Sequence, residues 1–174
     1  MPDNESAEKA VEHTMTSADH LHTAETARQR QRTFVPPSES YLPGVQDPAG
    51  DAMLDQLFYA TVDECPDPKC RPVLLDRVAG DVGATRKLVN WACWITSEVY
   101  GGLPEELVDE AAAADTVFCP STTFRRLAAE FHNQGPSFDV VYDACGAAQR
   151  REAADNAVAL VDGLQVWWTD FLYQ

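Results

Sequence analysis

Residues 153–172, AADNAVALVDGLQVWWTDFL, decide the fold that the sequence predicts. Apolar side chains recur here every three or four residues, which is the period of an α-helix with a buried face. They form two adjacent rows: Ala154, Val158, Val161, Leu164, Trp168 and Leu172, and beside them Ala157, Leu160, Leu164, Trp167 and Phe171. Two rows cover roughly half of the helix circumference, more than the ~100° stripe that one packing partner requires. We therefore expect this helix to contact at least two others and to be central to the domain.

Helical periodicity and helix-ending residues also predict the segments that precede this central helix. They span about residues 51–63, 72–78, 84–100, 104–114, 122–132 and 138–148. No stretch alternates apolar and polar residues with the period of two that a half-buried strand shows. The predicted fold class is therefore all-α, a single compact bundle of five to seven helices. Good helix formers at residues 149–152 favour a continuous helix there, although a turn is the alternative.

Local capping signals give the expected helix ends. Asp51, Ser121 and Ser137 are predicted N-caps, because a short polar side chain there accepts hydrogen bonds from exposed backbone amides. Pro104 suits the first turn of a helix, and the acidic residues that follow it favour the positive end of the helix dipole. We expect Arg125, with its neighbour Arg126, on the polar face of its helix.

Residues 1–48 differ in composition from the rest of the chain. They contain few large apolar side chains and end in the proline-rich run FVPPSESYLPGVQDP. Such a segment buries too little apolar surface to offset the entropy lost on ordering. We expect a disordered, acidic and proline-rich tail over residues 1–48 and one all-α domain over residues 49–174.

The tail nevertheless contains candidate binding residues. Arg28, Arg30 and Arg32 form a basic cluster in an otherwise acidic chain, and Phe34 and Tyr41 lie among prolines. Arginines followed by apolar anchors are typical of a short docking peptide. The alternative is a solvated linker whose few apolar side chains rest on the domain.

The charge balance limits the classes of partner. The chain has 28 acidic and 13 basic side chains, a formal net charge of −15, which repels nucleic-acid phosphates and anionic lipid. No apolar run is long enough for a membrane span, and residues 1–14 lack the apolar core of a signal peptide. Five scattered cysteines fit a reducing compartment. We therefore expect a soluble cytoplasmic protein that binds neither nucleic acid nor membrane, and whose acidity either attracts a basic partner or only aids solubility.

No catalytic or metal-binding motif stands out. Cys65 and Cys70 have a spacing that can hold Zn²⁺, but the sequence provides no second clustered pair of ligands beyond the scattered Cys119 and His132. Cys119 precedes a predicted helix, yet His132 would lie roughly 15 Å away at the other end of that helix. Acidic residues at 109, 110 and 115 form no paired motif. The sequence predicts no metal and no cofactor.

Two hypotheses of function remain open. In the first, the chain is a non-catalytic protein-binding or regulatory module that meets a protein partner or a second copy of itself through its acidic domain and its tail. In the second, it is a small helical enzyme or ligand carrier that binds a small molecule in an apolar pocket. The first adds Trp167 and Tyr173 as surface anchors to the tail residues. The second lines the pocket with Trp91, Trp94, Cys119 and Trp168, although tryptophans at helical spacing also fit an ordinary core.

Overall fold

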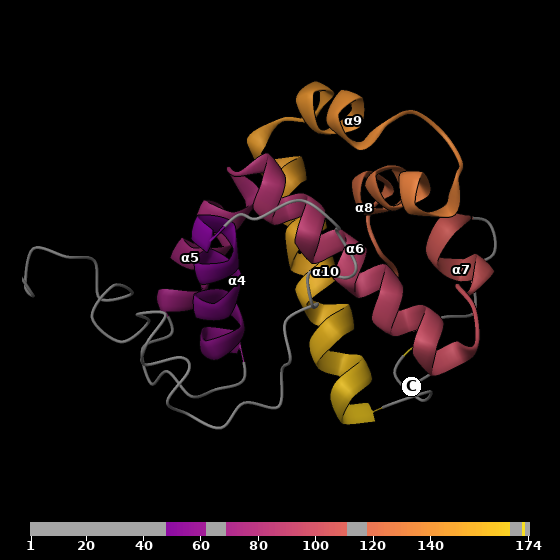
Figure 1. The fold of residues 1–174 in the computed structure, drawn as a ribbon, viewed down its shortest axis with the longest axis horizontal. Helices are drawn as coiled ribbons and strands as arrows, with labels where there is room; N and C mark the ends of the chain where they lie inside the picture. Colours follow the sequence, from indigo (N-terminus) through magenta and orange to yellow (C-terminus); the bar gives the residue numbers. More distant parts are fainter. Residues whose placement is uncertain (1–47, 62–68, 111–117, 168–171, 173–174) are drawn as a thin grey trace, which may run out of the picture.

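A computed structural model of the chain describes residues 48–61, 69–110, 118–167 and 172, and these residues form seven α-helices and one 3₁₀ turn without a strand (Figure 1). The elements are α4 (Pro48–Thr61), α5 (Cys70–Ala79), α6 (Val82–Tyr100), α7 (Glu105–Val108), α8 (Thr122–Ala128), η3 (Ala129–His132), α9 (Phe138–Ala144) and α10 (Ala147–Trp167). The predicted all-α helical bundle is confirmed. Residues 1–47 lie outside the described residues, so the predicted tail stays a prediction.

Helix α10 is the central element, as its two apolar rows predicted. The described members of both rows are fully buried, with 0% exposure. The helix packs mainly along α6 and also contacts α5, α8 and α4, so it has more than the two partners expected (Figure 1). Its described residues run to Trp167, and residues 168–171, over which the sequence predicts that the helix continues, lie outside the described residues. Leu172 is buried as well.

Helix α6 is buried on both sides because it lies between α10 and other helices. Leu88 and Trp91 on one side and Val89 and Cys93 on the other are all buried. The Asp81 carboxylate begins the helix by accepting a hydrogen bond from the Ala84 amide at 2.7 Å. At the other end Gly101 adopts a left-handed conformation with φ 71°, and the Gly102 amide donates to the Ser97 carbonyl. This C-terminal motif requires glycine and turns the chain away from α6.

Several helix boundaries differ from those expected. Helix α4 begins at Pro48, so Asp51 is not its N-cap; its carboxylate instead pairs with Lys87 on α6 at 2.7 Å. Helix α7 ends at Val108 and not near residue 114, because Asp109 is extended at φ −113° and ψ 118°. Helix α10 begins at Ala147, after an extended Cys145, and residues 149–152 are helical. Asp51 thus takes part in an ion pair between helices, whereas the extended residues Asp109 and Cys145 end α7 and α9.

The capping and polar-face predictions for α8 and α9 hold in part. Ser121 caps α8 as expected, because its Oγ accepts from the Phe124 amide at 3.1 Å. Ser137 precedes α9 but makes no side-chain capping bond. The prediction that Arg125 lies on a polar face is wrong: its side chain is only 6% exposed and lies under α7, where it donates to the Glu106 carbonyl at 3.3 Å. Because α7 packs against this part of α8, the side chain of Arg125 lies in the interior of the domain.

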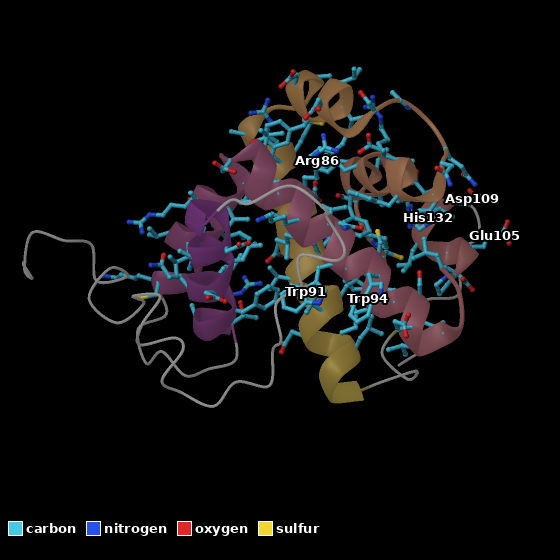
Figure 2. All side chains as sticks on the ribbon, viewed as in Figure 1. Arg86, Trp91, Trp94, Glu105, Asp109 and His132 are labelled. Atoms are coloured by element: carbon cyan, nitrogen blue, oxygen red, sulfur yellow. The ribbon has the colours of Figure 1, made fainter. Side chains whose placement is uncertain are left out.

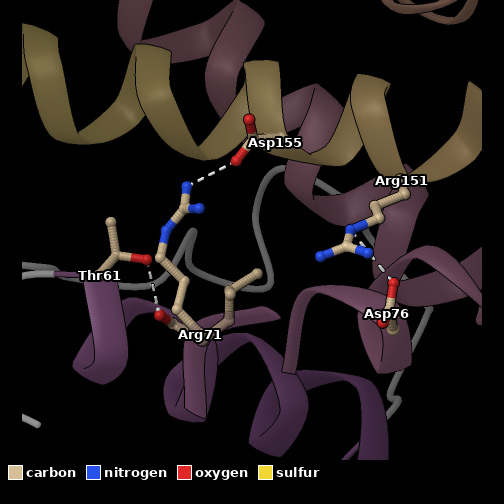
Figure 3. A network of polar contacts seen from close by, with 6 residues as sticks. Thr61, Arg71, Asp76, Arg151 and Asp155 are labelled. Atoms are coloured by element: carbon tan, nitrogen blue, oxygen red, sulfur yellow. Dashed lines mark hydrogen bonds and ion pairs between the residues drawn. The ribbon is translucent and has the colours of Figure 1, made fainter. Parts of the chain in front are cut away.

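Ion pairs connect the helices of one half of the molecule. Two ion pairs join α5 to α10 (Figure 3). Arg71 on α5 pairs with Asp155 on α10 at 2.6 Å, and Arg151 on α10 pairs with Asp76 on α5 at 3.2 Å. A second set centres on Arg86 of α6, which is within 2.8 Å of both Glu130 on η3 and Asp139 on α9. Arg71, Arg86 and Arg151 therefore form ion pairs between elements of the domain.

Among the described helices, none combines the length and the apolar composition that a membrane span requires.

Candidate protein-interaction surface

An acidic surface forms where α6 ends and α7 begins. From residue 88 to residue 124 the chain has six acidic residues and no lysine or arginine. We call the described carboxylates of this stretch the acidic corner: Glu98, Glu105, Glu106, Asp109 and Glu110. Figure 2 shows Glu105 and Asp109 together on the side of the molecule where α7 lies. The corner is therefore a local excess of negative charge within an acidic protein.

Backbone geometry positions the acidic corner. The glycine turn after α6 leads to Pro104, the N-cap of α7 with φ −59°. Leu107 anchors α7, since its side chain is only 1% exposed. The carboxylates of Glu105 and Glu106 occupy the first turn, where unpaired backbone amides favour negative charge. This arrangement holds one side of a very short helix in the core and leaves its acidic side outward.

The corner combines charge with partly exposed apolar surface. Glu98, Glu105, Asp109 and Glu110 are exposed, and Glu106 is half-buried. Half-buried apolar side chains lie in the same stretch of chain: Val99, Tyr100, Leu103 and Val108. A surface of this kind can attract a basic segment by charge and hold it by apolar contact.

Arg125 lies beneath the corner and not on its surface. Its guanidinium donates one hydrogen bond to the backbone carbonyl of Glu106 in α7, while its Nε atom is buried without a hydrogen-bond partner. An arginine at a helix C-terminus interacts favourably with the carbonyl groups there. Because the side chain is only 6% exposed, its hydrogen bond joins α8 to α7 in the interior of the domain.

His132 ends η3 on the same side of the molecule as Glu105 and Asp109 (Figure 2). Its Nε2 atom is buried and has no hydrogen-bond partner. Burial lowers the pKa of the imidazole below its usual 6.5, because the charged form loses more hydration than the neutral form. The neutral imidazole is thus favoured at neutral pH.

Carboxylates elsewhere are mostly engaged. Asp51, Asp76 and Asp155 each pair with a basic side chain of another helix, as do Glu130 and Asp139. Two further exposed carboxylates, Asp143 on α9 and Glu152 on α10, lie in the other half of the chain sequence, with Arg150 and Arg151 beside Glu152. The acidic corner differs from these carboxylates because it lies in a stretch of chain, residues 88–124, that contains no lysine or arginine.

The structure describes only some of the site residues predicted from the sequence. The tail residues Arg28, Arg30, Arg32, Phe34 and Tyr41 lie outside the described residues, as do Trp168 and Tyr173 and the side chain of Trp167. The predicted contributions of these residues to binding stay predictions.

Trp91, Trp94 and Cys119, which the pocket hypothesis uses, are described. Trp91 is 2% exposed and meets Phe58 of α4 edge-on, with ring centroids 4.6 Å apart. Trp94 is half-buried against the core, and Cys119 is exposed just before α8. Trp91 therefore joins α6 to α4 as a packing residue, and whether the others line a pocket stays a prediction.

The candidate metal ligands do not gather in the described part of the chain. Cys70 is fully buried as the first residue of α5, and Cys65 lies outside the described residues. Within residues 48–61, 69–110, 118–167 and 172, no three His, Cys, Asp or Glu side chains are placed to hold a metal ion.

The sequence-based reasoning missed the acidic corner as a unit. The sequence shows no paired motif at Asp109 and Glu110, and local patterns give no role to Glu98. The available signal was the absence of basic residues from position 88 to position 124, combined with Gly101 and Gly102, which end α6 between Glu98 and the acidic residues of α7.

Comparison with known proteins adds no relative: no protein-family model, no curated protein and no solved structure matches this chain.

Proposed function

We propose that this chain is a non-catalytic protein-binding or regulatory module whose acidic corner receives a basic, partly apolar segment of a partner. The observation that carries the proposal is the group of exposed carboxylates on and near α7. They lie with half-buried apolar side chains in a stretch of chain, residues 88–124, that contains no lysine or arginine. Negative charge of this kind speeds the approach of a basic partner, and apolar contact prolongs the complex.

The same charge argues against other partners. Phosphate groups of nucleic acids and anionic lipids would be repelled by the net charge of −15, so the proposed partner is a protein. The proposal places the module in the cytoplasm, a location supported by an odd number of cysteines scattered along the sequence.

Affinity purification with the full chain tests the proposal. We expect a protein partner to be captured at low salt and lost at high salt, because the Debye length falls from ~10 Å at 0.1 M to ~3 Å at 1 M. The double variant Glu98→Gln and Glu105→Gln should reduce capture of that partner several-fold. The control variant Asp143→Asn and Glu152→Gln removes the same charge from exposed positions outside the corner and should leave capture unchanged.

Two results would contradict the proposal. Equal loss of capture in both double variants would mean that net charge, and not the corner, drives association. Absence of any partner, together with a small molecule retained in native mass spectrometry, would favour the alternative of a small helical enzyme or ligand carrier.

A further inference from the structure

A buried positive charge in the domain has no negative partner in the described part of the chain. The side chain of Arg125 is 6% exposed, and no described carboxylate forms an ion pair with it, whereas Arg71, Arg86 and Arg151 all form ion pairs between elements. A buried guanidinium without a counter-charge is costly because it loses hydration, and arginine keeps its charge at any physiological pH. An anion bound at Arg125 would therefore stabilise this part of the domain.

The hydrogen-bond donors of Arg125 are also incompletely used. Its Nη2 atom donates to the Glu106 carbonyl at 3.3 Å, whereas its Nε atom is buried and has no hydrogen-bond partner. The N–H groups of a guanidinium form a planar fork that matches the two oxygens of a carboxylate. A carboxylate would therefore supply both the missing charge and the missing acceptor.

A second unpaired nitrogen lies on the same segment of chain. The Nε2 atom of His132 is buried without a hydrogen-bond partner, and it and Arg125 Nε are the only side-chain atoms of this kind in the described residues. His132 follows Arg125 by seven residues, or about two helical turns, so the two side chains leave the α8–η3 segment on nearly the same face. The Arg125 guanidinium contacts α7, and Figure 2 shows His132 on the side of the molecule where α7 lies. The incompletely satisfied polar groups thus gather where α7 covers α8 and η3.

We propose that the interior between α7 and the α8–η3 segment binds a small organic monocarboxylate, whose carboxylate accepts a hydrogen bond from Nε of Arg125. This inference goes beyond the proposed function and does not depend on the acidic corner. It adds a small-molecule site that is built on a buried arginine.

The charge balance favours a monovalent ligand. Burial lowers the pKa of His132 below its usual 6.5, so the imidazole is neutral at neutral pH and Arg125 supplies one positive charge to the site. A carboxylate brings one negative charge, whereas a phosphate group brings about 1.5 to 2 and would leave an excess. The net charge of −15 also repels a divalent anion more strongly than a monovalent one.

Helix α7 controls access to the site. It has only 4 residues, and Leu107 is its one buried residue. A helix this short is not stable by itself, so it can move locally while α6 and α8 stay folded. A carboxylate that neutralises Arg125 would hold the guanidinium against the Glu106 carbonyl. We therefore expect the ligand to slow hydrogen exchange of the Leu107 and Asp109 amides, which donate to the Pro104 and Glu105 carbonyls.

Titration of the ¹⁵N-labelled full chain with sodium acetate tests the inference, with sodium chloride used to keep the ionic strength constant. The Nε–Hε NMR signal of Arg125, identified by its absence from the Arg125→Gln variant, should shift and saturate. Near saturation, acetate should raise the melting temperature of the native chain by ~2–6 °C. The rise should vanish in Arg125→Gln and persist in Arg126→Gln, which removes a neighbouring exposed arginine.

Three results would overturn the inference. The first is an Arg125 signal that does not move with acetate, because water or another group of the chain would then satisfy Nε; this readout uses the native chain and holds even if Arg125→Gln does not fold. The second is an equal rise in melting temperature with acetate and with inorganic phosphate, which would contradict a monocarboxylate site. The third is an undiminished acetate effect in a folded Arg125→Gln variant. None of these measurements involves a protein partner, so each leaves the test of the proposed function at Glu98 and Glu105 unaffected.

Discussion

At the scale of single residues, two side chains in the described part of the chain each have a buried polar atom without a hydrogen-bond partner, and both lie on the α8 and η3 segment. Arg125 has a buried Nε atom without a partner, and His132 has a buried Nε2 atom without one. Arginine keeps its charge at any physiological pH, so Arg125 contributes a permanent positive charge beneath α7. Histidine can instead lose its charge, and burial lowers the pKa of His132 accordingly.

The titration of His132 predicts a pH dependence of stability. Because its pKa is lower in the folded state than the usual 6.5, the unfolded state binds more protons as the pH falls below about 6.5. The free energy of unfolding should therefore decrease as the pH is lowered through that window, and this part of the decrease should vanish in the His132→Gln variant. Urea denaturation of both proteins between pH 7.5 and pH 5.5 measures it. Parallel stability curves for the two proteins would show that His132 does not contribute.

At the scale of elements, α10 and α7 differ in what stabilises the helix. The sequence of α10 favours a helix by itself, whereas α7 depends on contacts with other elements. Helix α10 has 21 residues and buries every described member of its apolar rows, so periodicity and packing favour the same conformation. Helix α7 has only 4 residues and is held by one buried leucine and by the hydrogen bond from Arg125. Its acidic side thus depends on contacts made by α8.

A core substitution in α10 should be costly. Replacing Leu160 with alanine leaves a cavity between helices, and we expect the free energy of unfolding to fall by ~2–5 kcal/mol. Glu152→Ala changes an exposed position of the same helix and should alter stability by less than ~0.5 kcal/mol. Chemical denaturation of both variants provides the measurement. Similar stabilities would mean that α10 is not the central packing element.

At the scale of the whole molecule, charge is divided between two regions. Ion pairs join α4, α5, α9 and α10 to one another or to α6, while the acidic corner concentrates carboxylates around α7. The net charge of −15 destabilises the compact state through repulsion, and salt screens that repulsion. The exposed ion pairs lose strength under the same conditions, but each contributes little.

This balance predicts that salt stabilises the protein. Raising NaCl from about 0.05 M to about 0.5 M should increase the melting temperature of the full chain, because screening of the excess carboxylates outweighs the weakening of exposed ion pairs. Differential scanning calorimetry at both salt concentrations checks the direction. A lower melting temperature at high salt would show that the ion pairs between helices, and not the repulsion, dominate.

The sequence by itself determined the fold class, the positions of most helices and the central place of residues 153–172, because the period of apolar side chains is a local property that packing reinforces. Asp81, Gly101 and Ser121 end or begin helices through contacts within a few residues, and for this reason local signals located the end of α6 and the start of α8 well. Only the tertiary structure decided the burial of Arg125, the early end of α7 and the pairing of Arg71 with Asp155, which lie 84 residues apart. The acidic corner depends on both the sequence and the tertiary structure. The sequence determines its composition, but its exposure depends on α8 and the core, which hold α7 in place.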